Sequence, residues 1–198
     1  MGNDFNSKTI NPKTMSRTRW ISLIAGLALL ISLPFWGGDY IVNVFILILL
    51  YLAIGQMWNL MGGYAGLVAL GMQAFIGIGG YSLAIISQVY KMSIFLGFAV
   101  AVVISVSFAL LISIPLFRLK DIYFTVGSWL FAEALMVFFE GWGFVNYNIG
   151  YNITAAYRLS VTAMYFIAFG VAAIAMVATV LVLKSKFGLG LMAMRDNE

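Results

Sequence analysis

The chain has 198 residues, of which 63% are hydrophobic and 9% are charged, and its formal net charge is +4. So few charged residues cannot cover a water-soluble globule of this size, and the composition predicts a polytopic membrane protein. The chain holds no cysteine and no histidine, which excludes disulfides, thiolate metal sites and most imidazole chemistry and argues against an enzyme. We expect no catalytic residue, metal site or cofactor. The basic residues are spread over short loops, which argues against a nucleic-acid partner.

Long apolar segments predict an all-α transmembrane bundle of about six spans. Residues 1–19 are polar and are expected to form a cytoplasmic tail, whereas residues 20–183 are expected to form the transmembrane domain. The first apolar run is long for a signal peptide and has no small-x-small cleavage site after it, so we expect a retained helix. A polar, aromatic loop is expected over 140–158. The expected spans are 20–36, 40–61, a third from the glycine-rich stretch to about residue 90, 93–117, 122–139, and a sixth that ends at residue 183.

The basic residues predict the orientation of these spans. With a cytoplasmic N-terminus and six spans, only Lys91 and Arg158 fall on the outer side. This agrees with the positive-inside rule, and aromatic residues at the expected span ends agree with an aromatic belt. The basic residues predicted on the cytoplasmic side are Lys8, Lys13, Arg17, Arg19, Arg118, Lys120, Lys184, Lys186 and Arg195.

The stretch 62–80 reads GGYAGLVALGMQAFIGIGG and holds seven of the chain's twenty glycines. Glycine costs about 1 kcal/mol against alanine in a helix interior. Between membrane helices it permits close backbone approach, or a helix break that lines a cavity. We therefore expect a broken or re-entrant segment that acts as a backbone hinge or packing device, with Gly62, Gly66, Gly71 and Gly77 as candidate residues. Gly62 and Gly66 also form a small-xxx-small pair, which is common at ordinary helix contacts.

Three polar residues inside the expected spans are candidate pathway or helix-packing residues. Glu133 is the ionisable one, and it is expected either on a solute or proton route or as a hydrogen-bonding residue between helices. Gln56 and Asn59 lie one turn apart on one helix face. They are expected to bond across helices or to backbone groups freed by the break, and direct solute contact is the alternative.

Residues 184–198 follow the last expected span and read KSKFGLGLMAMRDNE. Small residues are followed by apolar ones and then by charges, which suits a short cytoplasmic helix that lies against another protein. A frayed terminus explains the same pattern.

Three separated segments carry recognisable motifs: NLMGGYAGLVALGMQAFIGIGGY over 59–81, RLKDIYFTVGSWLFAE over 118–133 and SKFGLGLMAMRDNE over 185–198. In this order and spacing they resemble the LivM-like permease subunits of ABC importers for branched-chain amino acids. That family has similar Gly-Tyr-Ala-Gly, Gly-Ile-Tyr-Phe-Ala and Ala-Ile-Arg-Asp-Asn-Glu patterns. Ala69 and Met72 stand where the family usually has serine and histidine, which reduces the polar lining near the expected break.

The resemblance implies a permease of the bacterial inner membrane with several partners. These are a second homologous permease, two ATP-binding cassette subunits and a periplasmic or extracellular solute-binding protein. Residues 184–198 would begin the loop that docks into the ATPase, with Gly188, Met194, Arg195 and Glu198 at matching positions. The family continues with further spans, so the chain resembles roughly the first two-thirds of such a permease and is expected to be truncated inside this loop.

The leading hypothesis is therefore a permease subunit of an ATP-driven importer for branched-chain or related small amino acids. The chain has no Gly-x-x-x-x-Gly-Lys-Ser/Thr motif, so it is not expected to be the ATPase. The alternatives are a self-contained channel or secondary carrier for a small neutral solute such as urea, and a truncated assembly piece that does not transport.

Overall fold

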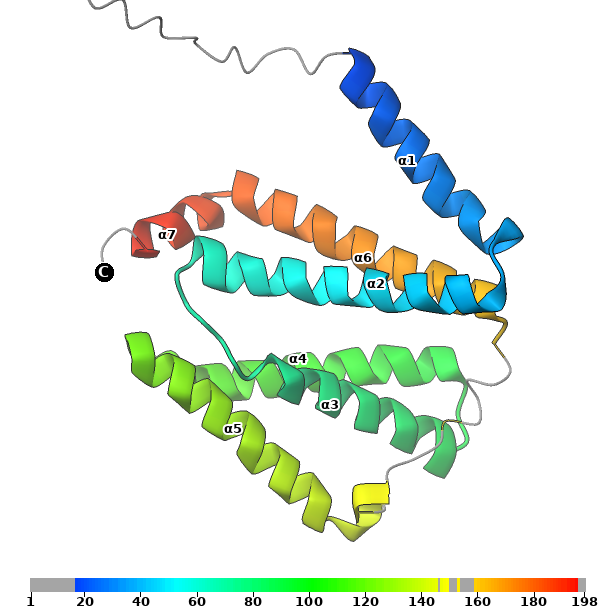
Figure 1. Cartoon of the computed structure of the whole chain (residues 1–198). Coiled ribbons are helices and arrows are strands. Elements are labelled where there is room, and N and C mark those ends of the chain that lie inside the picture. Colours follow the sequence, from blue (N-terminus) through cyan, green and yellow to red (C-terminus); the bar gives the residue numbers. More distant parts are fainter. Residues whose placement is uncertain (1–16, 146, 150–152, 154–158, 196–198) are drawn as a thin grey trace, which may run out of the picture.

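The described residues of the computed structural model, 17–145, 147–149, 153 and 159–195, are predominantly helical (Figure 1). This confirms the predicted all-α class. Five helical segments are long and apolar enough to cross a membrane, and Ile24–Trp36 forms a shorter apolar helix where the first span was predicted. The long helices and the turns between them are α1 Arg17–Trp36, α2 Asp39–Asn59, η1 Leu60–Tyr64, α3 Met72–Ala84, η2 Ile85–Val89, α4 Ile94–Leu116, α5 Asp121–Gly141, η3 Gly143–Val145, η4 Tyr147–Ile149, α6 Val161–Lys184 and α7 Lys186–Arg195.

Serine side chains mark the start of two of the longest helices. The Ser93 hydroxyl accepts a hydrogen bond from the Leu96 amide at the start of α4, and Ser160 accepts one from Ala163 at the start of α6. Each bond satisfies one of the amides that a helix N-terminus leaves without an intrahelical partner.

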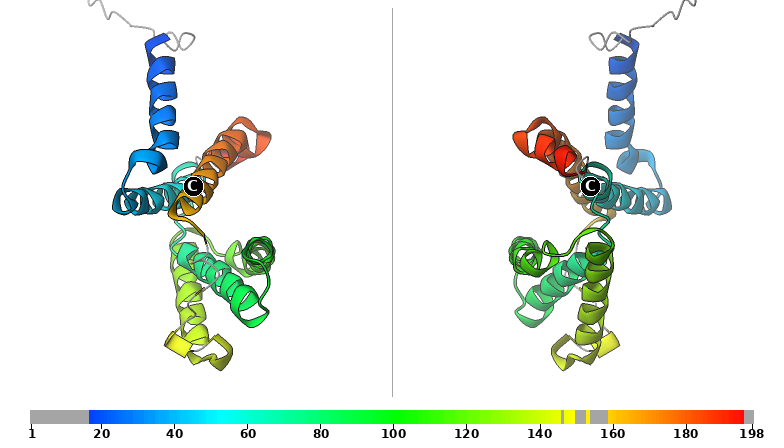
Figure 2. Two further views of the ribbon diagram at one scale, coloured as in Figure 1. Left: turned by 90° about the vertical axis from the view of Figure 1, so that its right-hand side faces the viewer. Right: turned by 90° about the vertical axis from the view of Figure 1, so that its left-hand side faces the viewer.

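The main helix contacts fall into two groups, α2 with α6, and α3 with α4 and α5 (Figures 1 and 2). In the first group, a stripe of small residues on α6 lets α2 approach closely, which is how membrane helices associate without a hydrophobic driving force. The buried residues of this contact include Val42, Leu49, Ala53, Ala168, Ala172 and Ala175.

Helix α1 leans away from the other helices in Figures 1 and 2 and is anchored at its C-terminal end. In a regular helix the Leu30 carbonyl would accept a hydrogen bond from the amide of residue 34. Pro34 has no amide hydrogen, so the Leu30 carbonyl has no donor within α1. The Tyr165 hydroxyl on α6 donates to that carbonyl at 2.7 Å. Tyr165 is 0% exposed and Leu33 is 1% exposed, so this contact is the point at which α1 joins the core.

Helix α5 runs at a clear angle to α2, α4 and α6 (Figures 1 and 2). It extends to Gly141, two residues beyond the predicted end of this span, so Glu140 is helical. The predicted loop therefore does not begin at Glu140. The polar side chain suggested a loop, whereas it lies on one face of the last turn of α5.

Candidate functional site

The helical segment formed by α2 and η1 ends inside the glycine-rich stretch. The π-helical turn η1 follows α2 to Tyr64, residues 65–71 form no helix, and α3 begins at Met72. Gly62 and Gly66 therefore do not share a helix face, so the small-xxx-small contact was a wrong reading of their spacing. Whether the stretch is re-entrant stays a prediction.

The non-helical segment is fastened to α5 at Ser128. The Ser128 hydroxyl accepts from the Leu70 amide at 3.1 Å and donates to the Thr125 carbonyl at 2.8 Å. A Cβ on Gly71 would overlap the Ser128 carbonyl, so the two backbones approach more closely than any larger residue permits. Ser128 is 3% exposed. The segment that separates α2 from α3 thus has one fixed point on α5.

The four predicted glycines differ in what their surroundings require. Gly66 has φ 75°, a left-handed conformation that favours glycine, and Gly71 faces the Ser128 backbone. A Cβ on Gly62 would make only ordinary contact with the Trp58 ring at 3.6 Å, and one on Gly77 would meet open space. The geometry therefore requires glycine at Gly66 and Gly71.

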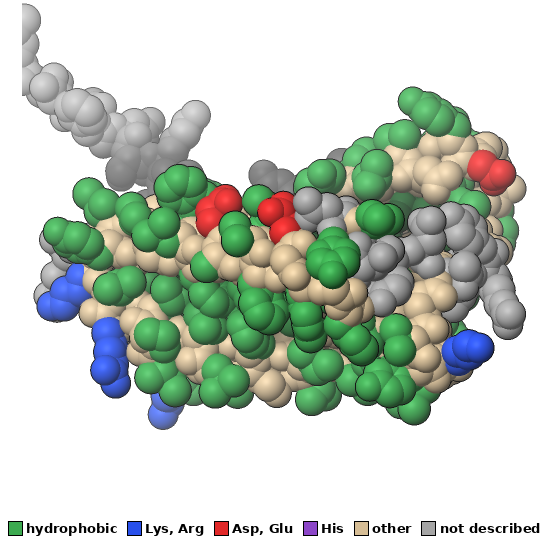
Figure 3. Space-filling model, turned by 90° about the horizontal axis from the view of Figure 1, so that it is seen from below, with side chains coloured by type: hydrophobic (Ala, Val, Ile, Leu, Met, Phe, Trp, Pro, Cys, Tyr) green, Lys and Arg blue, Asp and Glu red, His purple; other side chains and the backbone are tan. Residues whose placement is uncertain are grey.

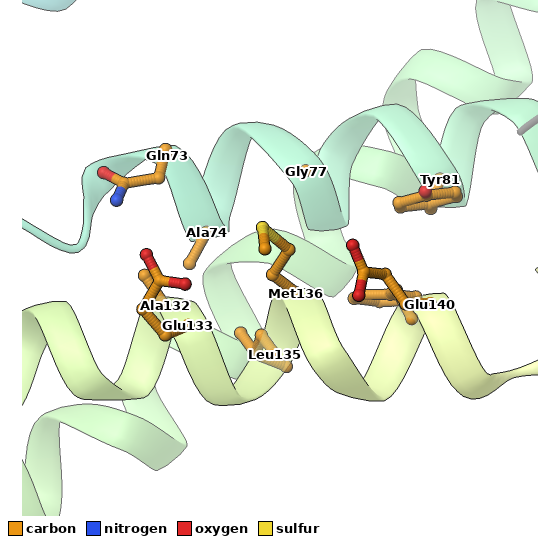
Figure 4. Close-up of a pocket in the computed structure, with 10 residues that line it drawn as sticks. Gln73, Ala74, Gly77, Tyr81, Ala132, Glu133, Leu135, Met136 and Glu140 are labelled. Carbon is orange, nitrogen blue, oxygen red and sulfur yellow. The ribbon is translucent and has the colours of Figure 1, made fainter. Parts of the chain in front are cut away.

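A groove of about 550 Å³ lies between α3 and α5 and contains the predicted residues Gly77 and Glu133. Figure 4 shows the Glu133 and Glu140 side chains pointing from α5 toward α3, with Gln73 across from the first and Tyr81 across from the second. The surface between the two ends is apolar. No basic side chain lines this groove among the described residues. We call this feature the acidic groove; it is lined by Gln73, Ala74, Gly77, Tyr81, Ala132, Glu133, Leu135, Met136, Phe139 and Glu140.

Glu133 and Glu140 have different surroundings within the acidic groove. The Trp129 indole, one turn earlier on α5, donates to a Glu133 carboxylate oxygen at 3.2 Å. Near Glu140, the rings of Tyr81 and Phe139 stack with centroids 4.6 Å apart. Glu140, Gln73 and Tyr81 were not singled out from the sequence. The seven-residue spacing from Glu133 to Glu140 was the available signal, because two helical turns return a side chain to the same face.

A second cavity, of about 420 Å³, lies on the cytoplasmic side of the predicted orientation, between the break, α4 and α5. Its lining includes Ala69, Met72 and Phe75 and is almost entirely apolar. Its two serines are already bonded, Ser128 as described and Ser113 to the Leu110 carbonyl at 2.7 Å. This cavity therefore offers a polar solute little compensation for lost water.

The remaining predicted polar residues lie away from both cavities. Gln56 is half-buried near the end of α2, and the exposed Asn59 side chain folds over Gly63 at the start of the break. Neither residue lines the acidic groove or the apolar cavity. Their role beside the break stays a prediction.

The predicted docking segment forms α7, which packs against the end of α6 and against η1. Gly188 occupies a tight corner, because a Cβ there would lie 2.6 Å from the Val182 carbonyl oxygen and 2.7 Å from Leu183 backbone atoms. Phe187 is 82% exposed beside it. Met194 and Arg195 lie in the last turn of α7, and Glu198 lies outside the described residues. Phe187 was not singled out from the sequence.

Within the part of the chain that the structure describes, no three acidic side chains gather in a way that suits a metal ion. Figure 3 shows basic side chains toward the two ends of the molecule, two acidic ones close together between those ends, and a third acidic one near the right-hand end. An acidic pair part-way along a membrane protein is costly in lipid unless it faces protein or a wet pathway.

Comparison with known proteins decides the family. The family described as branched-chain amino acid transport system / permease component matches residues 39–198. The chain belongs to this family. It is therefore a multi-pass membrane protein of a transport family, as the five apolar helical segments indicate.

The permease is also similar to two curated relatives, each called high-affinity branched-chain amino acid transport system permease protein LivM. It is 26% identical to the protein of Escherichia coli K12 and 25% identical to that of Salmonella typhimurium LT2, over 115 residues. The matching stretch covers 58% of this chain and 27% of each relative. No solved structure matches the chain significantly. The resemblance to LivM-like permeases is confirmed.

Proposed function

We propose that this permease is the membrane-embedded subunit of an ATP-driven importer for branched-chain or related small amino acids. The description of its family and the names of its two LivM relatives support this substrate class. ATP hydrolysis belongs to a separate partner in this proposal, because the chain has no phosphate-cradling Gly-x-x-x-x-Gly-Lys-Ser/Thr motif.

The observation that carries the proposal is the connection between the two helix groups. The α2 and α6 pair continues through η1 into the non-helical segment 65–71, which leads to the group of α3, α4 and α5. A short non-helical connection can absorb the backbone rotation that lets one group rock against the other. The acidic groove lies inside the second group, so rocking about this segment would carry the groove as a unit relative to α2 and α6 and change which side of the membrane it faces. Gln56 and Asn59 would hold the α2 end of the hinge in register.

The proposal assigns the permease to the bacterial inner membrane with its N-terminus in the cytoplasm. Residues 20–183 form the transmembrane domain, and residues 184–198 form the start of an ATPase-docking loop, with Gly188, Met194, Arg195 and Glu198 as docking residues. A second homologous permease, two ATP-binding cassette subunits and a solute-binding protein complete the importer. The contact of α7 with η1 supports this arrangement, since a helix moved by a partner would touch the start of the hinge.

Uptake of radiolabelled leucine tests the proposal in cells that express the permease with its partner subunits. We expect uptake to require ATP and to stop when the partner ATPase carries a substitution of its phosphate-binding lysine. Uptake that continues unchanged without a working ATPase would contradict the proposal. Flux through liposomes that contain this chain alone would favour a self-contained channel or carrier instead.

A further inference from the structure

We propose that the acidic groove binds the ammonium group of the transported solute, and that Glu133 and Glu140 are two successive positions for that group. This inference rests on the proposed function and adds the residues that recognise one end of a zwitterion. It starts from the placement of both carboxylates on the same side of α5, facing α3 across a groove of about 550 Å³ (Figure 4).

The charge of the acidic groove favours a cationic group. Two carboxylates line it without a basic neighbour among the described lining residues. A carboxylate that loses water is destabilised unless a positive charge or hydrogen-bond donors replace that water. The Trp129 indole supplies one donor to one oxygen of Glu133. Glu133 is half-buried and Glu140 is exposed, and within the described part of the chain no ion pair neutralises either carboxylate. A bound cation would do so.

The spacing of the carboxylates gives two positions rather than one. Seven residues correspond to about 10.5 Å along the α5 axis, which is too far for one small cation to contact both side chains. Each carboxylate has its own neutral neighbour across the groove, the Gln73 amide near Glu133 and the Tyr81 hydroxyl near Glu140 (Figure 4). A solute moving along the groove would pass from one such pair to the next.

An ammonium group suits these positions better than a metal ion. Each position offers one carboxylate and one neutral oxygen, and no group of three acidic side chains lies in the described part of the chain. An ammonium has three donors, which a carboxylate and an amide or hydroxyl oxygen can accept. The stacked rings of Tyr81 and Phe139 add an aromatic surface at the Glu140 position, and such surfaces attract ammonium groups.

The middle of the groove suits the aliphatic part of the same solute. Ala74, Gly77 and Met136 line it between the two acidic positions. Apart from the neighbouring residues and backbone of α3 itself, no heavy atom lies within 4 Å of a Cβ built on Gly77. The glycine thus leaves open the space that an aliphatic side chain would fill.

Tryptophan fluorescence measures binding directly, because Trp129 contacts Glu133. The full chain in lipid nanodiscs is titrated with leucine, with 3-methylbutylamine, which lacks the carboxylate, and with 4-methylpentanoate, which lacks the ammonium. We expect leucine and the amine to change the emission and the acid to leave it unchanged. Trp129→Phe should reduce the emission change, leaving the part that comes from Trp142, whose ring lies 6.0 Å from that of Phe139, while calorimetry still detects binding of leucine.

Variants of the acidic groove give the second part of the test. Glu133→Gln with Glu140→Gln should weaken binding of the amine about tenfold or more, because a charge-assisted bond is lost at each position. Asp39→Asn is the matched control, since it removes a carboxylate at the start of α2, away from the groove. Gly77→Leu should block binding of leucine, whereas Gly80→Leu, on the same helix but outside this groove, should not.

The outcomes separate this inference from the proposed function. Equal binding of the acid and the amine, unchanged binding by the double glutamine variant, or no binding by any probe would overturn the inference. Circular dichroism confirms that each variant keeps its helix content before it is scored. The titration uses no ATP and no partner, so a failure of ATP-dependent uptake with the binding pattern intact would overturn the proposed function alone.

Discussion

The bond from Tyr165 to the Leu30 carbonyl compensates for a defect that Pro34 creates within α1. A helix with an internal proline leaves one carbonyl without its usual donor, and leaving such a group unsatisfied in a buried position costs about 1–3 kcal/mol. Here the missing donor comes from a side chain 135 residues away in sequence. The proline on one helix and the tyrosine on another are therefore a matched pair.

The stability of the detergent-solubilised chain tests this pairing. Tyr165→Phe should lower the free energy of unfolding by about 1–3 kcal/mol, because the Leu30 carbonyl loses its donor. In a Pro34→Ala background the same change should cost less, since the alanine amide restores the intrahelical bond to Leu30. Tyr51→Phe, at an exposed tyrosine, is the control and should leave stability unchanged. Equal costs of Tyr165→Phe in both backgrounds would contradict the pairing.

At the scale of single elements, the break between η1 and α3 depends on two glycines for different reasons. A leucine at Gly66 is strained by the left-handed backbone, and a leucine at Gly71 has no room beside the Ser128 carbonyl. We expect either change to abolish transport or assembly, measured as leucine uptake and as recovery of the intact complex. Gly62→Ala is the control, because a Cβ there makes an ordinary contact. Normal uptake with normal assembly in both leucine variants would refute the requirement.

Helix α7 presents a large exposed aromatic side chain beside its tight first turn. If α7 docks on the ATPase, burying the Phe187 ring contributes about 2 kcal/mol or more to that contact. Phe187→Ala should therefore lower the amount of ATPase that copurifies with the permease and reduce uptake in parallel. Leu181→Ala, which removes an exposed side chain from α6 instead, should not change copurification. Full copurification by Phe187→Ala would place the ATPase contact elsewhere.

At the scale of the whole molecule, orientation can be tested because the chain has no cysteine. Lys91 lies in the connection between η2 and α4, and Lys184 is the last residue of α6, so single cysteines at these positions lie on opposite sides in the predicted topology. We expect a membrane-impermeant maleimide to label Lys91→Cys in intact cells and Lys184→Cys only after permeabilisation. The reverse pattern would place the N-terminus outside and would remove α7 from the reach of a cytoplasmic ATPase.

Hydropathy predicted the five long apolar helical segments, because lipid contact demands such segments wherever a chain crosses, whereas the first expected span holds a shorter apolar helix. The pairing of α2 with α6 was not predictable in the same way. Its determinant is a stripe of alanines, and alanine is common on lipid-facing and packed surfaces alike. Half of the acidic groove was also missed: Glu133 stood out in an apolar span, whereas Glu140 was assigned to a loop and Tyr81 was noted only as the last residue of the 59–81 motif.

The corner at Gly188 has a mechanical consequence. A junction without room for a methyl group between Val182, Leu183 and the next helix has few alternative backbone conformations. We expect α6 and α7 to turn together as an elbow of fixed angle, so that a push on α7 is delivered to its other neighbour, η1, instead of being lost in bending. Gly188 would then determine how much of the movement of a partner protein is transmitted to the membrane helices.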